Sequence, residues 1–545
     1  MSESTFDLII IGAGINGAGI ARDAALRGLS VLLLDKGDIG SGTSSASTRL
    51  IHGGLRYLEH VEFGLVRESL RERETLLRIA PHLVRPLPIL IPIYKNARRG
   101  SWTIRAGMIA YDLLSGLSGR KSLPSHLMLT RDDALGRAPG LRRDGLRGAA
   151  LYFDAQVEFA ERLVLENALA AEETGATVVT YARVDKLIVE RHTVRGVEYT
   201  NLTTSKQHRA DATLTINAAG PWVDELGGAA GAERMIGGTK GSHLVVAPFA
   251  GAPKTALYVE ALIDHRPFFI IPWNGNYLIG TTDTRYEGEP GQVKIDDQEI
   301  EYLLAETNRV IPEANLNDES ILFTYSGVRP LAYTKNQAEQ RITRRHFIHD
   351  HSPRLDGFIS IVGGKLTTYR SLAEQTVNVV FRKLGRDGPG CLTSQAPLPG
   401  AQTPMGTTAG SAGVALFSER FKSESGLSEL VSDRLLRIYG TRARSVLELA
   451  ATRSELRAEF STTGAIAAEV VFSFQHELAK TLADCLLRRT MVGLSATVGI
   501  GADEAAARIA QDHLGWSAER AQQEIVAFRT CAARLHIEAS QNRLR

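Results

Sequence analysis

The sequence predicts an α/β protein with three parts: a doubly wound domain, an antiparallel β-rich cap and a C-terminal all-α domain. Residues 6–11 are apolar except for Asp7 and end at Gly12, and a helical stretch and a second apolar run follow, as expected of buried parallel strands. Between residues 243 and 331, short β-rich runs alternate with turns, which is typical of an antiparallel sheet. Residues 385–413 are crowded with Gly, Pro, Ser and Thr and predict a linker. Beyond it, Ala, Leu, Glu and Arg recur at helical spacing.

The remaining elements follow in order along the chain. Residues 15–27 predict a helix and residues 30–34 a second buried strand, and this strand–helix–strand unit indicates a doubly wound sheet. Residues 61–80 and 157–174 are helical in period, and residues 176–199 predict a β-meander. The length of 545 residues is too great for one compact core, so we expect two or three domains.

Composition and charge exclude several classes of protein. With 43% hydrophobic and 23% charged residues, the chain is neither mainly disordered nor a disulfide scaffold. Its 63 Lys and Arg against 61 Asp and Glu give a net charge of +2, so no large field of one sign points to nucleic acid. The cysteines Cys391, Cys485 and Cys531 are too far apart for a Cys-rich zinc site or a four-Cys iron–sulfur site. We therefore expect a reducing compartment and no metal.

The first residues predict neither a secretory signal nor a transit peptide, and no apolar run reaches the ~18 residues that a spanning helix needs. Contact with a membrane surface stays open, and residues 98–121 are the best candidate. If residues 101–117 are helical, one narrow polar stripe faces a broad apolar surface, which suits either a buried cap helix or an interfacial helix. The stripe is Ser101, Arg105, Asp112 and Ser115, the apolar surface includes Trp102, Ile109, Leu113, Leu114 and Leu117, and the flanking basic residues are Arg98, Arg99, Arg120 and Lys121.

A glycine motif between the first strand and helix predicts a Rossmann-like dinucleotide site. Gly12 permits a tight turn, Gly14 lets the backbone approach a pyrophosphate, and Gly17 lets helix and strand pack closely. The helix N-terminus offers free N–H groups and a partial positive charge to phosphates. Asp35 ends the second strand at the expected spacing and can accept hydrogen bonds from a ribose.

This motif alone does not separate FAD from NAD. The segment 213–222 is a strand that breaks into small residues around Gly220, and the segment 358–368 is a strand followed by a glycine turn and a helix start. In a flavoprotein such a helix end can stabilise the negative charge that develops on the reduced ring. The hydroxyl-rich stretch 40–49, with Ser44 and Ser45, can bind phosphate or ribitol groups, although a solvated loop is the alternative.

Seven motifs occur in order, and the set resembles the FAD-dependent glycerol-3-phosphate dehydrogenases of the respiratory type. The likeness covers about residues 5–390 and continues more weakly through residues 477–490, which contain the pattern DCLLRR from Asp484. The motifs are GAGING at 12–17, TSSAS at 43–47, RLIHGGLRYLE at 49–59, KGSH at 240–243, IGTTD at 279–283, YSGVRP at 325–330 and GGKLTTYR at 363–370.

The resemblance implies an FAD-binding fold of the amine-oxidase-like type. It also implies sn-glycerol 3-phosphate as substrate, dihydroxyacetone phosphate as product and a membrane quinone as electron acceptor. A membrane quinone implies monotopic attachment, which we expect at the cytoplasmic face of the plasma membrane. The expected boundaries are residues 1–60, 145–230 and 330–390 for the FAD-binding domain, 61–144 and 231–329 for the substrate cap, 391–413 for the linker and 414–545 for the helical domain.

A phosphorylated polyol needs two or more cations to replace the hydration of its phosphate in a dry pocket. Arg56, Arg329 and Lys365 lie in three separate motifs, each beside a glycine or proline turn, and the resemblance puts them at the substrate. The alternative is that these residues lie on the surface and pair with acidic side chains, which is the more common role of a basic residue taken at random. Tyr57 and Thr368 are further candidates for binding substrate oxygens, and the sequence does not rank them.

Oxidation at C2 also needs a proton acceptor, for which histidine is suited. His243 is the expected base or hydroxyl-orienting residue, with Lys365 as a possible stabiliser of the alkoxide, whereas His52 is expected to shape the flavin loop. The residues expected to contact FAD are Gly12, Gly14, Gly17, Asp35, Ser44, Ser45, Gly54, Leu55, Val184, Gly220, Gly363, Gly364, Leu366 and Thr367.

Three alternatives stay open. The first is an oxidase that passes electrons from the same substrate to oxygen. The second is another flavin oxidoreductase acting on an amine or a hydroxy acid, which would not need three phosphate-ready cations. The third is a non-enzymatic dinucleotide-binding scaffold. The sequence leaves the oligomeric state open, with a homodimer among the alternatives.

Overall fold

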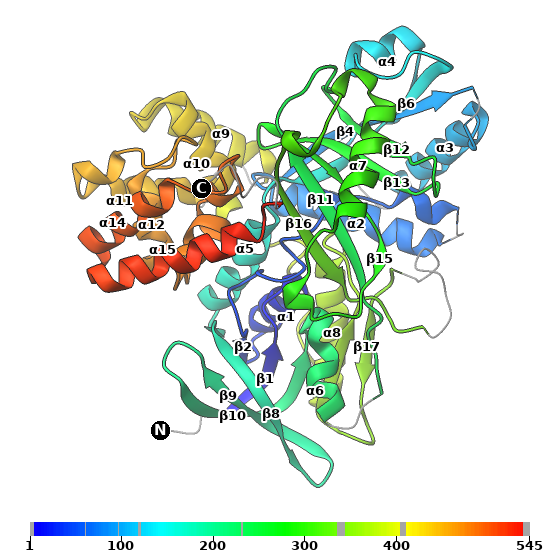
Figure 1. Cartoon of the computed structure of the whole chain (residues 1–545). Helices are drawn as coiled ribbons and strands as arrows, with labels where there is room; N and C mark the ends of the chain where they lie inside the picture. The colour runs from blue at the N-terminus through cyan, green and yellow to red at the C-terminus, as the bar shows by residue number, and fades with distance from the viewer. Residues whose placement is uncertain are drawn as a thin grey trace.

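The computed structural model describes residues 5–59, 62–95, 97–117, 121–229, 233–334, 344–403 and 410–537. Figure 1 shows three regions: a parallel sheet with its helices below, a second large sheet above it, and a cluster of helices, yellow to red, at the left. This architecture confirms the predicted fold class, and Arg120 of the basic flank lies outside the described residues.

The apolar runs of the sequence form the centre of the first sheet. β1 (Thr5–Ile11) pairs in parallel with β2 (Val31–Leu34) and with β10 (Lys206–Asn217), so that Ile10 lies between Leu33 and Ile216. The sheet has 8 strands, with the main order β17-β18-β10-β1-β2-β7. Its other strands are β7 (Thr177–Val179), β8 (Ala182–Glu190), β9 (Thr193–Asn201), β17 (Phe347–Asp350) and β18 (Phe358–Val362).

Three helices pack on one another beside this sheet. α1 (Ile15–Leu26) connects β1 to β2 and packs against α5 (Ala160–Glu173) and α8 (Tyr369–Lys383). α5 confirms the helix predicted over 157–174. The predicted meander over 176–199 is only partly correct, because β7 pairs in parallel with β2 and the meander is instead β8-β9-β10.

The second sheet has 10 strands and forms the cap. β11 (Thr239–Val246) lies between β14 (Asn276–Gly280) and β16 (Ile321–Arg329), antiparallel to both, which confirms the predicted antiparallel sheet over 243–331. The other strands are β3 (Leu50–Ile51), β4 (Val84–Tyr94), β5 (Leu127–Leu129), β6 (Leu146–Val157), β12 (Ala256–Glu260), β13 (Pro267–Trp273) and β15 (Thr284–Arg285). The helices of this region are α2 (Phe63–Ile79), α3 (Ser101–Leu117), α4 (Arg131–Arg137) and α7 (Asp297–Val310), and α6 (Val223–Ala229) follows the first sheet.

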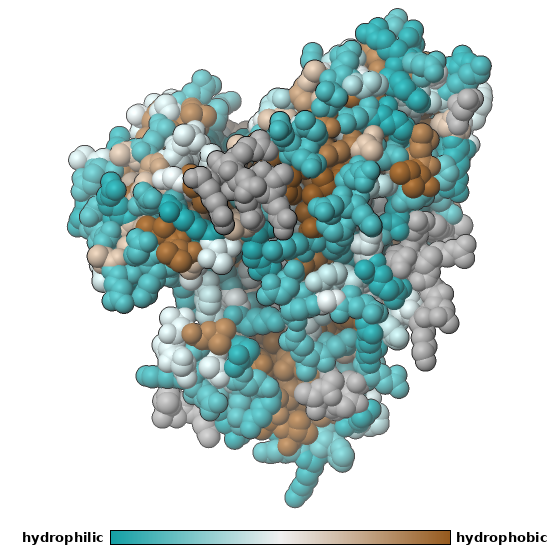
Figure 2. Space-filling model, viewed as in Figure 1, coloured by the Kyte–Doolittle hydropathy of each residue, from teal (hydrophilic) through white to brown (hydrophobic). Residues whose placement is uncertain are grey.

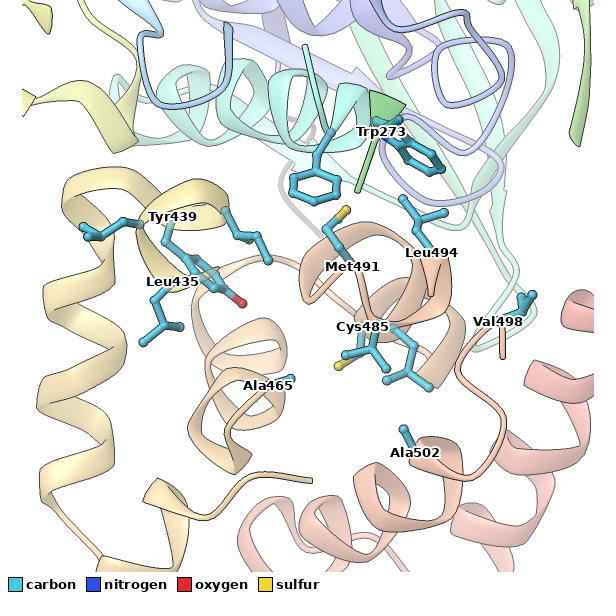
Figure 3. Close-up of a cluster of buried hydrophobic side chains, with 14 of the residues drawn as sticks. Trp273, Leu435, Tyr439, Ala465, Cys485, Met491, Leu494, Val498 and Ala502 are labelled. Atoms are coloured by element: carbon cyan, nitrogen blue, oxygen red, sulfur yellow. The ribbon is translucent and has the colours of Figure 1, made fainter. Parts of the chain in front are cut away.

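The helices after residue 410 share their core with the cap. Trp273 of β13 belongs to the same buried cluster as Met491 and Leu494, which lie near it in Figure 3, and Asn274 Nδ2 donates a hydrogen bond to the carbonyl of Leu494 (3.0 Å). The helices are α9 (Ser411–Glu424), α10 (Glu429–Tyr439), α11 (Ala443–Ala451), α12 (Ala467–His476), α13 (Leu482–Asp484), a π-helical turn (Cys485–Arg489), α14 (Ala502–Leu514) and α15 (Ala518–Ala533).

The segment that leads to these helices is packed rather than solvated around Gly400. Gly400 N donates to Glu166 Oε2 (3.0 Å), and a Cβ on Gly400 would lie 2.4 Å from His82 Nε2. Residues 404–409 of the predicted linker lie outside the described residues. The short 3-10 helices among the described residues are Leu55–Leu58, Gly220–Trp222, Pro290–Gln292, Pro312–Ala314, Asp318–Ser320, Pro399–Ala401, Gly440–Arg442, Ser454–Arg457 and Val492–Leu494.

Candidate functional site

The glycine turn between β1 and α1 leaves no room for side chains. Gly12 has φ +103°, and a Cβ there would lie 2.7 Å from the carbonyl oxygen of Ala218. A Cβ on Gly17 would lie 1.8 Å from the carbonyl oxygen of Gly12. Gly14 is the N-cap of α1 and provides no side-chain cap, so the helix N-terminus presents backbone N–H groups to an anion. The turn thus has the geometry expected of a pyrophosphate site.

Asp35 and Ser44 close around this turn. Asp35 Oδ2 accepts a hydrogen bond from Ala13 N (2.6 Å), and Ser44 Oγ accepts one from Ile15 N (3.0 Å) at the start of α1. Burial raises the pKa of Asp35, although hydrogen bonds from the backbone of Gly37 and Ala13 oppose the shift. Both side chains therefore lie where the phosphates and ribose of a dinucleotide would bind.

Three further predicted contacts lie near this turn. Ala182 N donates to the carbonyl of Asp35 (2.7 Å), which brings Val184, two residues further along β8, to the same edge. Gly220, with φ +59°, follows Ala218 at the end of β10. Ser45 lies in the same loop as Ser44, and its Oγ donates to the carbonyl of Gly42 (3.0 Å).

A second glycine turn joins this region to the cap. Gly363 and Gly364 follow β18 with φ +79° and +99°, and Asn16 Nδ2 of α1 donates to the carbonyl of Gly363 (3.1 Å). A Cβ on Gly364 would lie 2.7 Å from that amide nitrogen. Thr367 Oγ1 accepts a hydrogen bond from His52 N (3.2 Å), so the turns after β3 and β18 meet. Gly54 adopts φ +76° beside them.

A cavity of about 820 Å³ opens between these turns and the cap sheet. Six cations line it, of which Arg49 is paired with the buried Glu161. We call the other five the cationic cluster: Arg56, Arg266, Arg329, Arg344 and Lys365. Such a concentration of positive charge in one cavity suits a small anion that carries more than one negative charge.

Arg329 is held in place by the turn between β14 and β15. Its Nη1 donates to Asp283 Oδ1 (2.9 Å) and its Nη2 to Thr281 Oγ1 (2.9 Å). Arg344 Nη2 binds the other oxygen of the same carboxylate, Asp283 Oδ2 (2.9 Å). Burial and the nearby Arg344 and Arg266 lower the pKa of Arg329 to about 10, although Asp283 opposes the shift. One carboxylate therefore serves two guanidinium groups, and the cluster keeps a surplus of positive charge.

Lys365 lies over the ring of Tyr57, with Nζ 3.9 Å from the ring centroid. The buried Nζ atom has no hydrogen-bond partner in the described part of the chain. Burial lowers the pKa of Lys365. A buried cation without a hydrogen-bonding partner is costly, so this group is suited to an anionic ligand atom.

His243 is held on β11 in a neutral state. Its Nε2 pairs with Thr48 Oγ1 (2.9 Å), and its ring stacks on Tyr325 at 4.8 Å. The buried Nδ1 has no hydrogen-bond partner among the described residues. Burial, with the charges of Arg329 and Arg49, lowers the pKa of His243 well below its usual 6.5. The imidazole is therefore neutral at pH 7 and able to accept a proton.

His52 lines the same cavity and is a second neutral imidazole. Burial lowers its pKa, and the charges of Lys365 and Arg73 act in the same direction, while Asp154 opposes them. The geometry thus places both histidines at the cavity, and His243 is the one whose ring is fixed by side-chain contacts.

Most predicted residues gather at one of two places. Thr368 is the exception: it is buried at the start of α8 and does not line the cavity. Those around the start of α1 are Gly12, Gly14, Gly17, Asp35, Ser44, Ser45, Val184, Gly220 and Gly363, and those that line the cavity are Gly54, Leu55, Arg56, Tyr57, His243, Arg329, Gly364, Lys365, Leu366 and Thr367.

Sequence reasoning missed Thr48, Asp283 and Arg344 as parts of the site. Thr48 lies in the hydroxyl-rich stretch and Asp283 ends a recognised motif, so both had a signal in the sequence. Arg344 had none beyond its charge, because only the fold brings it to Asp283. Among the described residues, no group of three or more His, Cys, Asp or Glu side chains is arranged to hold a metal ion.

Comparisons with known proteins match the whole chain. Residues 7–370 match the family model described as FAD dependent oxidoreductase, and residues 391–521 match the C-terminal domain of alpha-glycerophosphate oxidase. A glycerol-3-phosphate dehydrogenase of Synechocystis sp. is 46% identical over 97% of this chain and 96% of its own length. An aerobic glycerol-3-phosphate dehydrogenase of Bacillus subtilis is 34% identical over 90% of this chain and 88% of its own.

The structure is also similar to solved ones. The glycerol-3-phosphate dehydrogenase of Bacillus halodurans, solved in complex with FAD, matches with a TM-score of 0.78 at 29% identity, over 98% of this chain and 96% of that one. The L-alpha-glycerophosphate oxidase of Mycoplasma pneumoniae matches with a TM-score of 0.56 at 18% identity, over 72% of this chain and 98% of that one, which shows a shared fold.

Proposed function

The chain belongs to the family of FAD-dependent glycerol-3-phosphate dehydrogenases, and from this we propose that it oxidises sn-glycerol 3-phosphate to dihydroxyacetone phosphate and passes the electrons to a membrane quinone. One observation supports the substrate above all others: the cationic cluster and a neutral histidine line one cavity beside the residues that fit FAD. A glycerol-sized substrate without a phosphate would leave the surplus positive charge of this cluster unbalanced.

The residues divide between binding and chemistry. Arg329 and Arg56 bind the phosphate, because guanidinium groups match its oxygens with paired hydrogen bonds. Lys365 acts as a compact charge near the oxygen on C2. Tyr57 lies under this ammonium and keeps it in place.

The reaction removes a hydride from C2 and a proton from its hydroxyl, which leaves a ketone. When bound, FAD supplies the acceptor for the hydride. His243 takes the proton, and Thr48 fixes its ring through a hydrogen bond with Nε2. The low pKa of His243 keeps the imidazole neutral at neutral pH before each turnover.

A second cavity supports a quinone as electron acceptor. It has a volume of about 700 Å³ and shares Leu55, Arg56 and Tyr258 with the first cavity. One wall is α3, through residues that include Ile104 and Met108. An apolar ring compound could therefore enter from the side of α3 as far as the junction of the two cavities at Leu55, Arg56 and Tyr258.

Helix α3 has the surface that contact with a lipid bilayer requires. Met108 and Tyr111 face the protein, whereas Trp102 (80% exposed), Leu113 (64%) and Leu117 (67%) face outward. The sequence left a buried cap helix open as the alternative, and these exposures contradict it. Figure 2 shows a small apolar patch at the right of the molecule, near the labels α3 and β13 of Figure 1. An outward apolar face with a tryptophan is typical of interfacial helices.

Basic residues beside α3 extend this surface. Lys121 pairs with Asp112 of the helix, and Arg99 pairs with Glu59 and Glu260. No helix among the described residues has the length and apolar character to cross a bilayer. We therefore propose monotopic attachment through α3, at the cytoplasmic face of the plasma membrane.

The acceptor can be tested on the reduced enzyme. After anaerobic reduction by sn-glycerol 3-phosphate, the flavin band should return faster with a short-chain ubiquinone analogue than with air-saturated buffer. Fast reoxidation by oxygen, with one hydrogen peroxide released per flavin, would instead identify an oxidase. That alternative is a real competitor, because residues 391–521 match a domain described for an oxidase.

A further inference from the structure

The side chains of two adjacent arginines of the C-terminal helical region bind the same carboxylate of the FAD-binding region. Arg489 binds Asp38 through both of its Nη atoms: Nη2 lies 2.7 Å from Oδ1 and Nη1 lies 2.8 Å from Oδ2. Arg488 Nε donates to Oδ2 of the same residue (2.5 Å). Asp38 and Arg489 are both fully buried. These arginines are the last two residues of the DCLLRR pattern, to which the reaction gives no role.

Asp38 lies in the turn that leads from β2 to the hydroxyl-rich loop, three residues after Asp35. The carbonyl of Asp38 accepts a hydrogen bond from Ser41 N (3.1 Å), and Gly40 N donates to the carbonyl of Ala13 (3.0 Å). Ala13 N in turn donates to Asp35 Oδ2. Hydrogen bonds thus connect the turn that contains Asp38 to the glycine motif at Ala13, and through Ala13 to Asp35, the acid expected to bind the ribose.

The same helical region holds this turn from a second side. Asp484 Oδ1 accepts a hydrogen bond from Tyr181 OH (2.7 Å), and Lys480 Nζ donates to the carbonyl of Thr180 (3.0 Å). Tyr181 N donates to the carbonyl of Gly37 (3.0 Å). Arg488 joins the two sides, because its Nη2 also binds Asp484 Oδ1 (2.8 Å).

Stability alone is a weak reason for such an arrangement. Burial on its own would raise the pKa of Asp38, but Arg489 and Arg488 lower it, so the carboxylate stays charged. Buried ion pairs lose about as much free energy on desolvation as they regain, and apolar replacements often fold equally well. A bidentate guanidinium–carboxylate pair does, however, fix the relative position of two backbones.

We propose that Arg488 and Arg489 form a clamp through which the C-terminal helical domain positions the 35–41 turn for the adenosine half of FAD. Arg489 is then a positioning residue for FAD, although it does not touch the cofactor site itself. The helical domain acts as part of the FAD site, and its contribution is confined to the end of the cofactor that is remote from the cationic cluster.

A second buried ion pair across the same boundary provides the matched control. Arg162 of α5 binds Glu477 with both nitrogens (2.6 and 2.8 Å), and both side chains are fully buried. This pair ends on a helix and does not touch the 35–41 turn. Arg489 Nε donates to the carbonyl of Glu477 (2.7 Å), so the control pair adjoins the clamp without binding Asp38. The variants Arg489→Lys and Arg162→Lys each disrupt one buried bidentate pair between the same two regions, and only the first removes the bidentate bonds to Asp38.

The test titrates FAD into apoprotein and follows the quenching of flavin fluorescence, with thermal unfolding of the same apoproteins measured in parallel. We expect both variants to unfold at similarly lowered temperatures. The FAD dissociation constant should rise about tenfold in Arg489→Lys, in line with one charged hydrogen bond lost from the positioning turn, and stay within about twofold of the parent in Arg162→Lys. The absorption band of bound flavin should be unchanged in both, because the isoalloxazine end is untouched.

Equal rises in the dissociation constant for the two variants, or no rise in either, would overturn the proposal, because the arginines would then only dock the domain. Should Arg489→Lys fail to fold, Arg488→Lys replaces it, since Arg488 is partly exposed and Asp38 keeps its bidentate partner. That variant should weaken FAD binding severalfold, and an unchanged affinity would equally contradict the clamp. Neither readout uses a substrate, so the outcome is independent of the proposed reaction.

Discussion

Arg329 and Asp283 form an ion pair (Nη1 to Oδ1, 2.9 Å) in which the carboxylate is shared with a second guanidinium, that of Arg344. Arg329 and Arg344 attract Asp283 strongly enough to lower its pKa despite burial, yet the pKa of Arg329 falls to about 10. The two arginines thus repel each other across one acid, and a phosphate that enters the cavity relieves this repulsion. The pair holds Arg329 ready for an anion rather than neutralising it.

The first prediction concerns this arginine. Arg329→Met should lower kcat/KM for sn-glycerol 3-phosphate by about a hundredfold or more, because a charged pair with the substrate phosphate is lost. Bound flavin per protein should equal that of the parent, since Arg329 does not contact the turn around α1. Steady-state kinetics and the absorbance ratio of flavin to protein check both parts, and a colourless variant would refute the assignment.

The second prediction concerns Asp35 at the FAD end of the site, where a substitution should weaken cofactor binding rather than substrate use. Asp35→Ala removes the acid that binds Ala13 N and faces the ribose, so the FAD dissociation constant should rise about tenfold or more. With FAD added in excess, KM for the substrate should return to the parental value. A variant that keeps FAD as tightly as the parent would show that Asp35 serves the turn alone.

The third prediction is a pH dependence. Because burial and the charges of Arg329 and Arg49 lower the pKa of His243, the base is deprotonated at neutral pH and becomes protonated only in acid. The acidic limb of the kcat/KM profile should therefore lie below pH 6.5. Loss of the nearby positive charge in Arg329→Met should raise the pKa of His243 and move this limb to higher pH. An acidic limb that stays in place in the variant would point to a different base, with His52 as the next candidate.

The fourth prediction concerns the membrane. Replacing Trp102, Leu113 and Leu117 of α3 together by Ser should release the protein from sedimenting vesicles, because roughly 2 kcal/mol of apolar burial is lost for each large side chain. Substrate-dependent reduction of a soluble dye should persist. The control is Leu430→Ser on α10, which is 61% exposed in the helical domain and should change neither property. Full sedimentation of the triple variant would assign the contact to another surface.

The sequence pattern of neighbouring residues was enough to predict β1, α1 and α3. The apolar run at 6–11 and the glycine motif specified β1, its turn and α1, because strand burial and glycine geometry are read directly from neighbouring residues. Helix α3 begins and ends at the residues expected, Ser101 and Leu117. β7 was misassigned to the meander, because three residues carry no signal of which strand they pair with, and they pair in parallel with β2.

Pairing between distant residues could not be predicted in this way. The meeting of Arg344 with Asp283, of Thr48 with His243 and of Arg489 with Asp38 depends on how the sheets and the helical domain are placed. The outward orientation of α3 also required the structure. Met108 and Ser115, which lie on or beside the polar stripe, face the protein. In most surface helices the apolar side faces the protein, whereas in α3 much of the apolar side faces outward.

The most direct measurement is anaerobic reduction of the flavin by a single substrate. The purified holoprotein should lose its flavin absorption band within one turnover on mixing with sn-glycerol 3-phosphate, and should keep it on mixing with glycerol at the same concentration. This result would show that the cationic cluster recognises the phosphate and that C2 is oxidised at the flavin. Equal bleaching by both compounds, or by neither, would contradict the account.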